Sequence, residues 1–444
     1  MLPPKTRRAD QSSGQAVPSG RLARFAGFSS MAGGIAGTML VDGAKQWAQG
    51  KRPSVGELLL TPANARKIAD KLATMRGAAM KLGQLMSMDT GDFLPPELAD
   101  ILARLRADAQ HMPQGQLRNV LNQNWGRGWE KRFASFDFKP IAAASIGQVH
   151  RARTLDGRDL AIKVQYPGVR QSIDSDVDNV ASLIKLTGLL PPELDIDPML
   201  ADAKAQLHEE ANYTHEAGHL ARFGELLAGS QHFRVPALHA DLTTSDILAM
   251  DYIESIAVEE TVQLDQPQRD RIVELLVELL LRELFDFQLM QTDPNFANYR
   301  FDPESGKLVL LDFGATRIVA DRVSEAYRTL LRGGMERDIA RMREGGLTLG
   351  MLHPDAPENH KVAVLGMFDT AFEPLRIDAP FDFTSNEMTM ELRDEGMAFA
   401  KERTFWQIPP VDTLFIQRKI GGVFLIGSRL KANTNVHRLI RAAL

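Results

Sequence analysis

The chain has 444 residues, of which 44% are hydrophobic and 25% charged, a composition typical of a folded globular protein. The formal net charge of -5 argues against a nucleic-acid-binding protein, which would carry a basic excess. The chain has no cysteine, which excludes disulfides, thiolate zinc sites, iron–sulfur clusters and a cysteine nucleophile. This composition fits a reducing compartment such as the cytoplasm.

The first part of the chain is predicted to be a disordered tail over residues 1–20, followed by a helical extension over residues 21–110. Within the extension, residues 25–41 are apolar but rich in glycine, and they are at the lower length limit for a bilayer span. Gly33 and Gly37 form a GxxxG spacing that allows close helix contact. We interpret this segment as a helix that packs on a partner, such as a second copy of the chain, or touches a membrane surface. A flexible tail leading into a packed helix explains the pattern equally well.

The next part of the chain, residues 111–255, is predicted to form a small mixed lobe. Residues 111–138 are expected to form one or two helices. Two strands follow, over 140–155 and 160–165, and the turn Asp156-Gly157 joins them as a hairpin. Later segments of this lobe are predicted as a helix over 198–227 and strands over 234–238 and 246–252.

The last part, residues 256–444, is predicted to form a larger, helical lobe. It begins with a strongly apolar helix over 269–289, and a hairpin over 299–301 and 307–311 follows. The remaining residues are expected to be mostly helical. A small mixed lobe followed by a helical lobe predicts an α+β fold with the element order of a protein kinase.

Phosphoryl transfer requires cations for the phosphates, carboxylates for the metal and a group that orients the nucleophile. Lys163 ends an Ala-Ile-Lys motif on the predicted strand 160–165. In protein kinases, the lysine at the end of such a motif binds the α- and β-phosphates of ATP. Asp293 and Asn298 follow the long apolar helix with the spacing of a kinase catalytic loop, and Asp312 begins an Asp-Phe-Gly motif after an apolar strand. We therefore predict that Asp293 orients the nucleophile and that Asn298 and Asp312 bind the metal.

The turn expected to cover the nucleotide is alanine-rich where ordinary kinases have glycine. It consists of Ala142, Ala143, Ala144 and Ser145, and alanine stiffens such a turn because it lacks the freedom of glycine at positive φ. Residues 81–84 have the sequence Lys-Leu-Gly-Gln. The alanine-rich turn and this KxGQ motif resemble the UbiB family of atypical kinases, also called aarF-domain kinases, over residues 60–430. The sequence Gln-Thr-Asp-Pro-Asn at 291–295 resembles the coenzyme Q-supporting branch of that family.

The resemblance implies a protein-kinase-like fold with the KxGQ helices lying over the site where a peptide substrate would dock. It implies ATP binding and hydrolysis with Mg²⁺ or Mn²⁺, and support of ubiquinone biosynthesis at membranes. Lys81 and Gln84 would then reach into the nucleotide site. The implied partners are isoprenoid-lipid precursors or ubiquinone-biosynthesis proteins, and the implied location is the cytoplasm, with peripheral contact at the inner membrane.

The family also has an acidic ExD motif whose members contact the KxGQ residues. The matching stretch begins at Glu210, and Asn212 replaces the second acid. We expect Glu210 to pair with Lys81 or Lys163, with Glu209 and Glu216 as rivals.

The same stretch contains a formal HExxH motif, formed by His215, Glu216 and His219, which could bind zinc as in metalloproteases. Gly218 weakens the helix between the two histidines, and no third ligand follows at a typical spacing. Two further alternatives remain: a nucleotide-gated lipid-binding module that transfers no phosphate to a substrate, and a small-molecule phosphotransferase, in which a KxGQ motif is not expected.

Overall fold

The structure is a computed structural model that describes residues 111–144, 146–187, 197–385 and 409–444. The chain divides into two compact units. The first contains the described residues up to Ala217 together with Leu238–Tyr252, and the second contains Gly218–Ala237 and Ile253–Leu444. The tail and extension predicted before residue 111 lie outside the described residues.

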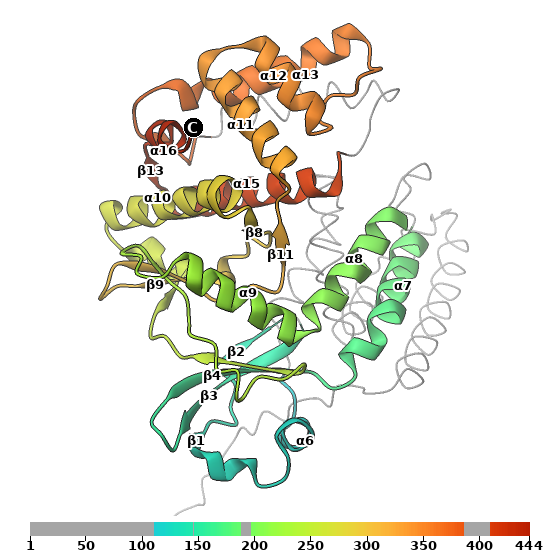
Figure 1. Ribbon diagram of the computed structural model, residues 1–444, viewed down its shortest axis with the longest axis vertical. Coiled ribbons are helices and arrows are strands. Elements are labelled where there is room, and N and C mark those ends of the chain that lie inside the picture. The colour runs from blue at the N-terminus through green and yellow to red at the C-terminus, as the bar shows by residue number, and fades with distance from the viewer. Residues whose placement is uncertain (1–110, 145, 188–196, 386–408) are drawn as a thin grey trace, which may run out of the picture. The chain divides into compact units, whose positions relative to one another are not determined.

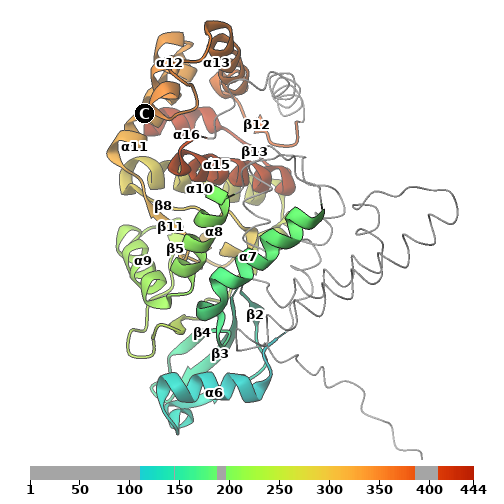
Figure 2. The same ribbon diagram turned by 90° about the vertical axis from the view of Figure 1, so that its right-hand side faces the viewer.

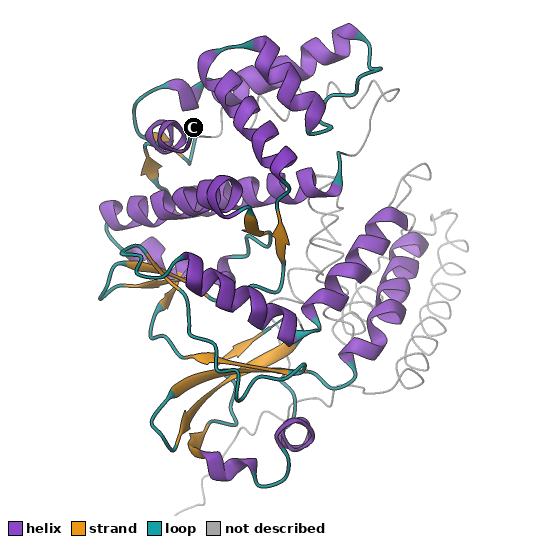
Figure 3. Cartoon of the chain, in the orientation of Figure 1, coloured by secondary structure: helices purple, strands orange, loops and turns teal. Residues whose placement is uncertain are grey.

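The first unit is built on an antiparallel sheet of five strands within the described residues, in the order β1-β3-β4-β6, and β2 also pairs with β3. Figure 3 draws the strands in orange. The strands are β1 (Phe133–Phe136), β2 (Ala142–Ala143), β3 (Gly147–Thr154), β4 (Asp159–Gln165) and β6 (Ile247–Asp251). Gly157 has a φ of 94° in the turn between β3 and β4, a conformation that favours glycine. The hairpin predicted around Asp156-Gly157 is therefore confirmed.

Helices α6 (Gln114–Trp125) and η2 (Trp129–Arg132) contribute to the core of this unit. Trp129, Leu117 and Leu121 are buried in one cluster with residues of β3, β4 and β6. The prediction of helix throughout residues 111–138 is wrong at its end, because Phe133 and Ser135–Phe136 pair with β3. A short aromatic segment can bury its rings equally well in a strand or in a helix. Here the segment forms a strand because β3 is available for pairing.

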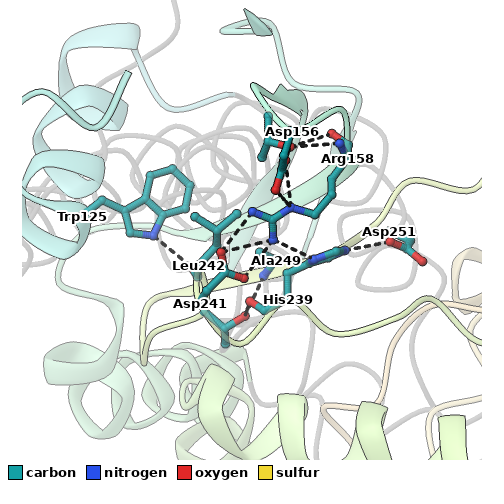
Figure 4. Close-up of polar contacts among 10 residues, drawn as sticks. Trp125, Asp156, Arg158, His239, Asp241, Leu242, Ala249 and Asp251 are labelled. Carbon is teal, nitrogen blue, oxygen red and sulfur yellow. Dashed lines mark hydrogen bonds and ion pairs between the residues drawn. The ribbon is translucent and has the colours of Figure 1, made fainter. Parts of the chain in front are cut away.

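A polar cluster ties the β3–β4 turn to the segment before β6 in the same unit (Figure 4). Arg158 donates hydrogen bonds to Asp156 and Asp241, and its Nη1 lies 3.2 Å from Nδ1 of His239. His239 Nε2 lies 2.7 Å from Asp251 Oδ1. The hydrogen bond from Arg158 holds the pKa of Asp241 below its ordinary value. The cluster anchors the loop that leads into β6.

Three helices separate the strands of this region in the chain: α7 (Val169–Thr187), α8 (Asp197–Glu210) and α9 (Tyr213–Leu226). Helices α7 and α8 lie side by side (Figures 1 and 2). The helix predicted over 198–227 is present but breaks at Ala211–Asn212. The break starts a new helix at Tyr213, and the orientation of α9 is therefore independent of that of α8.

The second unit begins its helical part with α10 (Gln266–Arg282), whose N-terminus is capped by Asp265 through the Gln268 N–H at 3.0 Å. Helix α10 ends in the π-helical turn η4 (Glu283–Phe287), and Gln288 then takes a φ of 47°. The predicted helix over 269–289 is thus confirmed except for its last two residues, Gln288 and Leu289. The turn and Gln288 redirect the chain into β8 (Leu289–Gln291).

The sheets of this unit are small. One has the order β5-β10-β9-β7, and β8 pairs with β11. The strands are β5 (Phe233–Arg234), β7 (Ile256–Ala257), β9 (Tyr299–Asp302), β10 (Lys307–Leu310) and β11 (Thr316–Ile318). The predicted hairpin is confirmed by the β9–β10 pair, in which Leu310 lies opposite Tyr299. A 3-10 turn, η5 (Phe296–Asn298), lies between β8 and β9.

The remaining chain is mostly helical, as predicted. Helices α10 and α15 pack against each other (Figures 1 and 2). The other elements of this unit are η3 (Val258–Gln263), α11 (Asp321–Glu336), α12 (Ile339–Thr348), α13 (Glu358–Phe372), η6 (Pro374–Arg376), β12 (Phe381–Asp382), α15 (Val411–Leu430), β13 (Asn433–Thr434) and α16 (Val436–Ala443).

Candidate functional site

Lys163 lies in the middle of β4, between β3 and β6. Its register partners are Val149 on β3 and Leu248 on β6. Every residue from Leu160 to Gln165 is buried, so Lys163 places its charged group in a largely apolar sheet. A buried ammonium group requires a counter-ion, and the structure provides one.

The counter-ion of Lys163 is Glu216 on α9. The Lys163 Nζ lies 2.8 Å from Glu216 Oε1 and 2.9 Å from Oε2, and the two side chains are 9% and 1% exposed. The Tyr213 ring, one turn earlier on α9, has its centroid 5.1 Å from the same Nζ. Glu216, one of the two rivals, is therefore a partner of Lys163, and the alternative pairing of Glu210 with Lys81 stays a prediction because Lys81 lies outside the described residues. Tyr213 and Glu216 lie on one face of α9 because they are three residues apart, whereas Glu210 ends the preceding helix.

The alanine-rich turn forms a hairpin at the start of the sheet. Ala142 and Ala143 pair with Val149 and Gln148, and the Ala144 N–H donates to the Gly147 carbonyl at 2.9 Å. A Cβ atom on Gly147 would lie 2.5 Å from the Val164 carbonyl oxygen and 2.8 Å from the Tyr213 hydroxyl. Only glycine fits at this position, which the sequence analysis did not single out.

The second unit carries the predicted catalytic loop. Asn295 caps η5 by accepting the Ala297 N–H at 3.1 Å, and this turn holds Asn298 at its end. Asn298 Nδ2 donates to the Asp293 carbonyl at 2.9 Å and lies 3.4 Å from Asp293 Oδ2. Asp293 Oδ1 accepts a hydrogen bond of 2.8 Å from Arg418 Nη2. The structure thus brings Asp293 and Asn298 together, and Arg418 joins them.

Asp312 follows the end of β10, beside the same loop. The Leu311 N–H donates to the Asn298 carbonyl at 3.1 Å, and Asp312 Oδ1 accepts the Gly314 N–H at 2.9 Å. Phe313 is buried, with its ring centroid 4.8 Å from that of Phe223. The Asp-Phe-Gly motif therefore has an anchored phenylalanine and a carboxylate next to Asn298.

Asn298 and Asp312 line the same small cavity, together with Glu283, Gln291 and Tyr299. Amide and carboxylate oxygens are the donors that Mg²⁺ and Mn²⁺ prefer. The Asp312 carboxylate and the Asn298 amide oxygen are therefore suitable ligands for a hard divalent cation.

A buried lysine beneath this loop was not found from the sequence. Lys419 on α15 lies 2.9 Å from Glu283 Oε2, and both side chains are 1% exposed. Burial alone would lower the pKa of Lys419, but Glu283 and Tyr299 outweigh burial and raise it. No local pattern marks Arg418 or Lys419, because their partners lie 120 or more residues earlier in the chain.

Some predicted site residues cannot be placed. Lys81, Gln84 and Ser145 lie outside the described residues, as does the apolar segment over 25–41. In the HExxH motif, Glu216 is bound to Lys163 and so is not positioned as the general base of a zinc site. Within the described ranges, no three histidine, aspartate or glutamate side chains gather as metal ligands.

Comparison with known proteins identifies the family. Residues 104–345 match the ABC1 atypical kinase-like domain, which is more than half of the chain. The chain belongs to the ABC1 atypical kinase-like family. The resemblance to the UbiB kinases is thereby confirmed, and so is the α+β, kinase-like fold.

Relatives of this ABC1 kinase-like protein match along nearly its whole length. The atypical kinase COQ8, mitochondrial, of Saccharomyces cerevisiae is 35% identical over 436 residues, covering 98% of this chain and 87% of that protein. The atypical kinase COQ8B, mitochondrial, of Rattus norvegicus is 34% identical, and the match covers 97% of this chain and 81% of that protein. A solved Rv3197–erythromycin complex from Mycobacterium tuberculosis has the same fold, with a TM-score of 0.57, 24% identity, and coverage of 85% of this chain and 94% of that one.

A helix of this ABC1 kinase-like chain would need about 20 mainly apolar residues to cross a bilayer. Among the described residues, no helix has both the length and the apolar character needed to cross a membrane.

Proposed function

We propose that this chain is an atypical kinase or ATPase that binds ATP with Mg²⁺ or Mn²⁺ and supports ubiquinone (coenzyme Q) biosynthesis. The observation that carries the proposal is the Lys163–Glu216 ion pair, with both carboxylate oxygens within 2.9 Å of the ammonium group. Protein kinases require this strand-lysine to helix-glutamate pair for a competent site.

Each predicted residue has a role in this proposal. Lys163 binds the α- and β-phosphates, and the alanine-rich turn covers the nucleotide. Asn298 and Asp312 hold the cation, and Asp293 orients the group that attacks the γ-phosphate. When bound, Mg²⁺ or Mn²⁺ would neutralise charge on the phosphate oxygens. Lys81, Gln84, Ser145 and Glu210 remain proposed contacts of the nucleotide site.

The proposal also concerns the biological role. The relatives named COQ8 motivate the link to ubiquinone, and isoprenoid-lipid precursors or ubiquinone-biosynthesis proteins are the proposed partners. We also propose that the protein is cytoplasmic, with peripheral contact at the inner membrane. It would form a homodimer through the segment 25–41. The relatives' names place those proteins in mitochondria.

The variant Asp312→Asn tests the metal site. Binding of a fluorescent ATP analogue to the wild type should depend on Mg²⁺ and be lost on addition of EDTA. In Asp312→Asn the Mg²⁺-dependent part should fall by about 100-fold or more, because a carboxylate ligand is replaced by a neutral amide.

Asp286→Asn is the matched control, since the Asp286 side chain on η4 is 66% exposed and lies 4.0 Å from Arg282 Nε. The control should bind as the wild type does. Unchanged Mg²⁺-dependent binding in Asp312→Asn would contradict the assignment of this residue.

A further inference from the structure

Helix α15 is in direct contact with the catalytic loop of the same unit. A Cβ atom on Gly422 would lie 2.2 Å from Cβ and Cγ of Pro294, the residue that follows Asp293. A Cβ atom on the neighbouring Gly421 would meet nothing within 4 Å. The loop can therefore pack against the helix because position 422 has no side chain. A Cβ atom at position 421 would not contact the loop.

One turn earlier on the same helix face, Arg418 contacts the reacting end of the loop. Positions 418 and 422 are four residues apart and so project from one face. Arg418 Nη2 lies 2.8 Å from Asp293 Oδ1, and the two side chains are 7% and 18% exposed. A charge-assisted hydrogen bond shielded from water in this way restricts the carboxylate more strongly than a surface pair would.

Lys419 supports the strand that leads into the loop. Its Nζ donates to the Gln291 carbonyl at 2.8 Å and to the Tyr299 hydroxyl at 2.7 Å. Gln291 Nε2 in turn donates to the Asp293 carbonyl at 2.8 Å. The backbone on the N-terminal side of Asp293 is thus held from α15 as well.

The loop has no cation of its own. Between Asp293 and Asn298 the sequence is Pro-Asn-Phe-Ala, so the positive charge beside Asp293 comes from another element. Within the described part of the second unit, Asp293 forms its ion pair with Arg418.

We infer that α15 positions the nucleophile-orienting carboxylate: Arg418 sets the rotation of the Asp293 side chain, and Gly422 sets the position of the loop backbone. Arg418 acts through Asp293 and is a positioning residue. This inference rests on the proposed ATP hydrolysis, and it adds a C-terminal helix to the machinery for that reaction.

The decisive comparison is Gly422→Ala against Gly421→Ala. Both changes add one methyl group and the same gain in helix propensity, but only the methyl group at position 422 would displace Pro294. We expect kcat for Mg²⁺-dependent ATP hydrolysis to fall by about 10- to 100-fold in Gly422→Ala, because a shift of about 1 Å in a positioned group has that effect. KM for ATP should stay within about two-fold, and Gly421→Ala should retain the wild-type kcat.

Arg418 is tested by Arg418→Met and Arg418→Lys. Removing the charge should lower kcat strongly, and lysine should restore part of it, since it keeps the charge but not the planar fork. Equal kcat in the Gly422→Ala and Gly421→Ala variants, together with full activity in Arg418→Met, would overturn the inference.

Hydrogen exchange separates this inference from the proposed function. Without nucleotide, the peptide containing residues 291–298 should exchange faster in Gly422→Ala and Arg418→Met than in the wild type and Gly421→Ala. If the wild type fails to hydrolyse ATP, the proposed function fails, and the exchange rates still decide whether α15 holds the loop. Unchanged exchange in both variants would count against the positioning role.

Discussion

At the scale of single residues, Lys163 and Glu216 form a charge pair that water barely reaches. Their side chains are 9% and 1% exposed, so the ion pair stabilises both charges in an interior that water barely reaches. Breaking a buried pair leaves an unpaired charge in the interior, whereas replacing both members can be nearly neutral. Substitutions of Lys163 and Glu216 should therefore have non-additive effects on the free energy of unfolding. This test of the pair requires no nucleotide.

We expect Lys163→Met to lower the free energy of unfolding by about 3–5 kcal/mol, because the buried Glu216 carboxylate loses its ion pair with the Lys163 ammonium group. The double variant Lys163→Met/Glu216→Leu should recover much of that loss. Urea unfolding of the single and double variants measures the coupling. Arg118→Met, which breaks the exposed Arg118–Glu130 pair, is the control and should cost about 0–1 kcal/mol. Strictly additive effects at 163 and 216 would speak against a coupled pair.

At the scale of elements, a chain of buried hydrogen bonds joins β3 to the residue that follows β1 and to the segment before α6. His150 Nδ1 donates to the Asp137 carbonyl at 2.8 Å, so Nε2 accepts from Gln148 Nε2 at 2.9 Å. Gln148 Oε1 in turn accepts the Met112 N–H at 2.7 Å. Both side chains on β3 are fully buried. This chain of hydrogen bonds requires a neutral histidine.

Burial lowers the pKa of His150 below its ordinary value of 6.5. Between the lowered pKa and 6.5, the unfolded chain binds a proton that the folded chain does not. The stability contributed by neutral His150 is therefore present above pH 6.5 and is lost as the pH falls through that window.

We predict that the free energy of unfolding, measured by urea denaturation, decreases more steeply below pH 6.5 in the wild type than in His150→Gln, which cannot be protonated. His208→Gln is the control, because His208 is an exposed surface residue. Parallel pH profiles for the wild type and His150→Gln would rule out this role for His150.

At the scale of the whole molecule, the matches to the COQ8 relatives of Saccharomyces cerevisiae and Rattus norvegicus cover 98% and 97% of this chain, and 87% and 81% of those proteins. The proposed role in ubiquinone synthesis is therefore open to a test in cells. Deletion of the gene should lower cellular ubiquinone, measured by chromatography of extracted lipids. Restoration should fail with Asp293→Asn, because the neutral amide cannot replace a carboxylate that orients the nucleophile. Asp286→Asn should restore the ubiquinone level, and normal ubiquinone in the deletion strain would refute the role.

The sequence by itself determined the kinase-like order of Lys163, Asp293, Asn298 and Asp312, and the hairpins and helices that carry them. These features are local: a catalytic loop, an Asp-Phe-Gly motif and a two-residue hairpin turn each lie within a few residues of the chain. Local hydrogen bonds bring together the residues whose spacing predicts that they are close. An example is the hydrogen bond from Asn298 to the Asp293 carbonyl.

Only the tertiary structure decided which groups these residues meet. Glu216 pairs with Lys163 because the chain breaks after α8 and restarts α9 on a new face, which no count of residues from Lys163 reveals. Residues 133–136 form a strand because β3 offers a partner. Arg418 reaches Asp293 across 125 residues of sequence, and Gly422 makes room for Pro294. Such contacts depend on the packing of distant elements, and sequence periodicity carries no information about them.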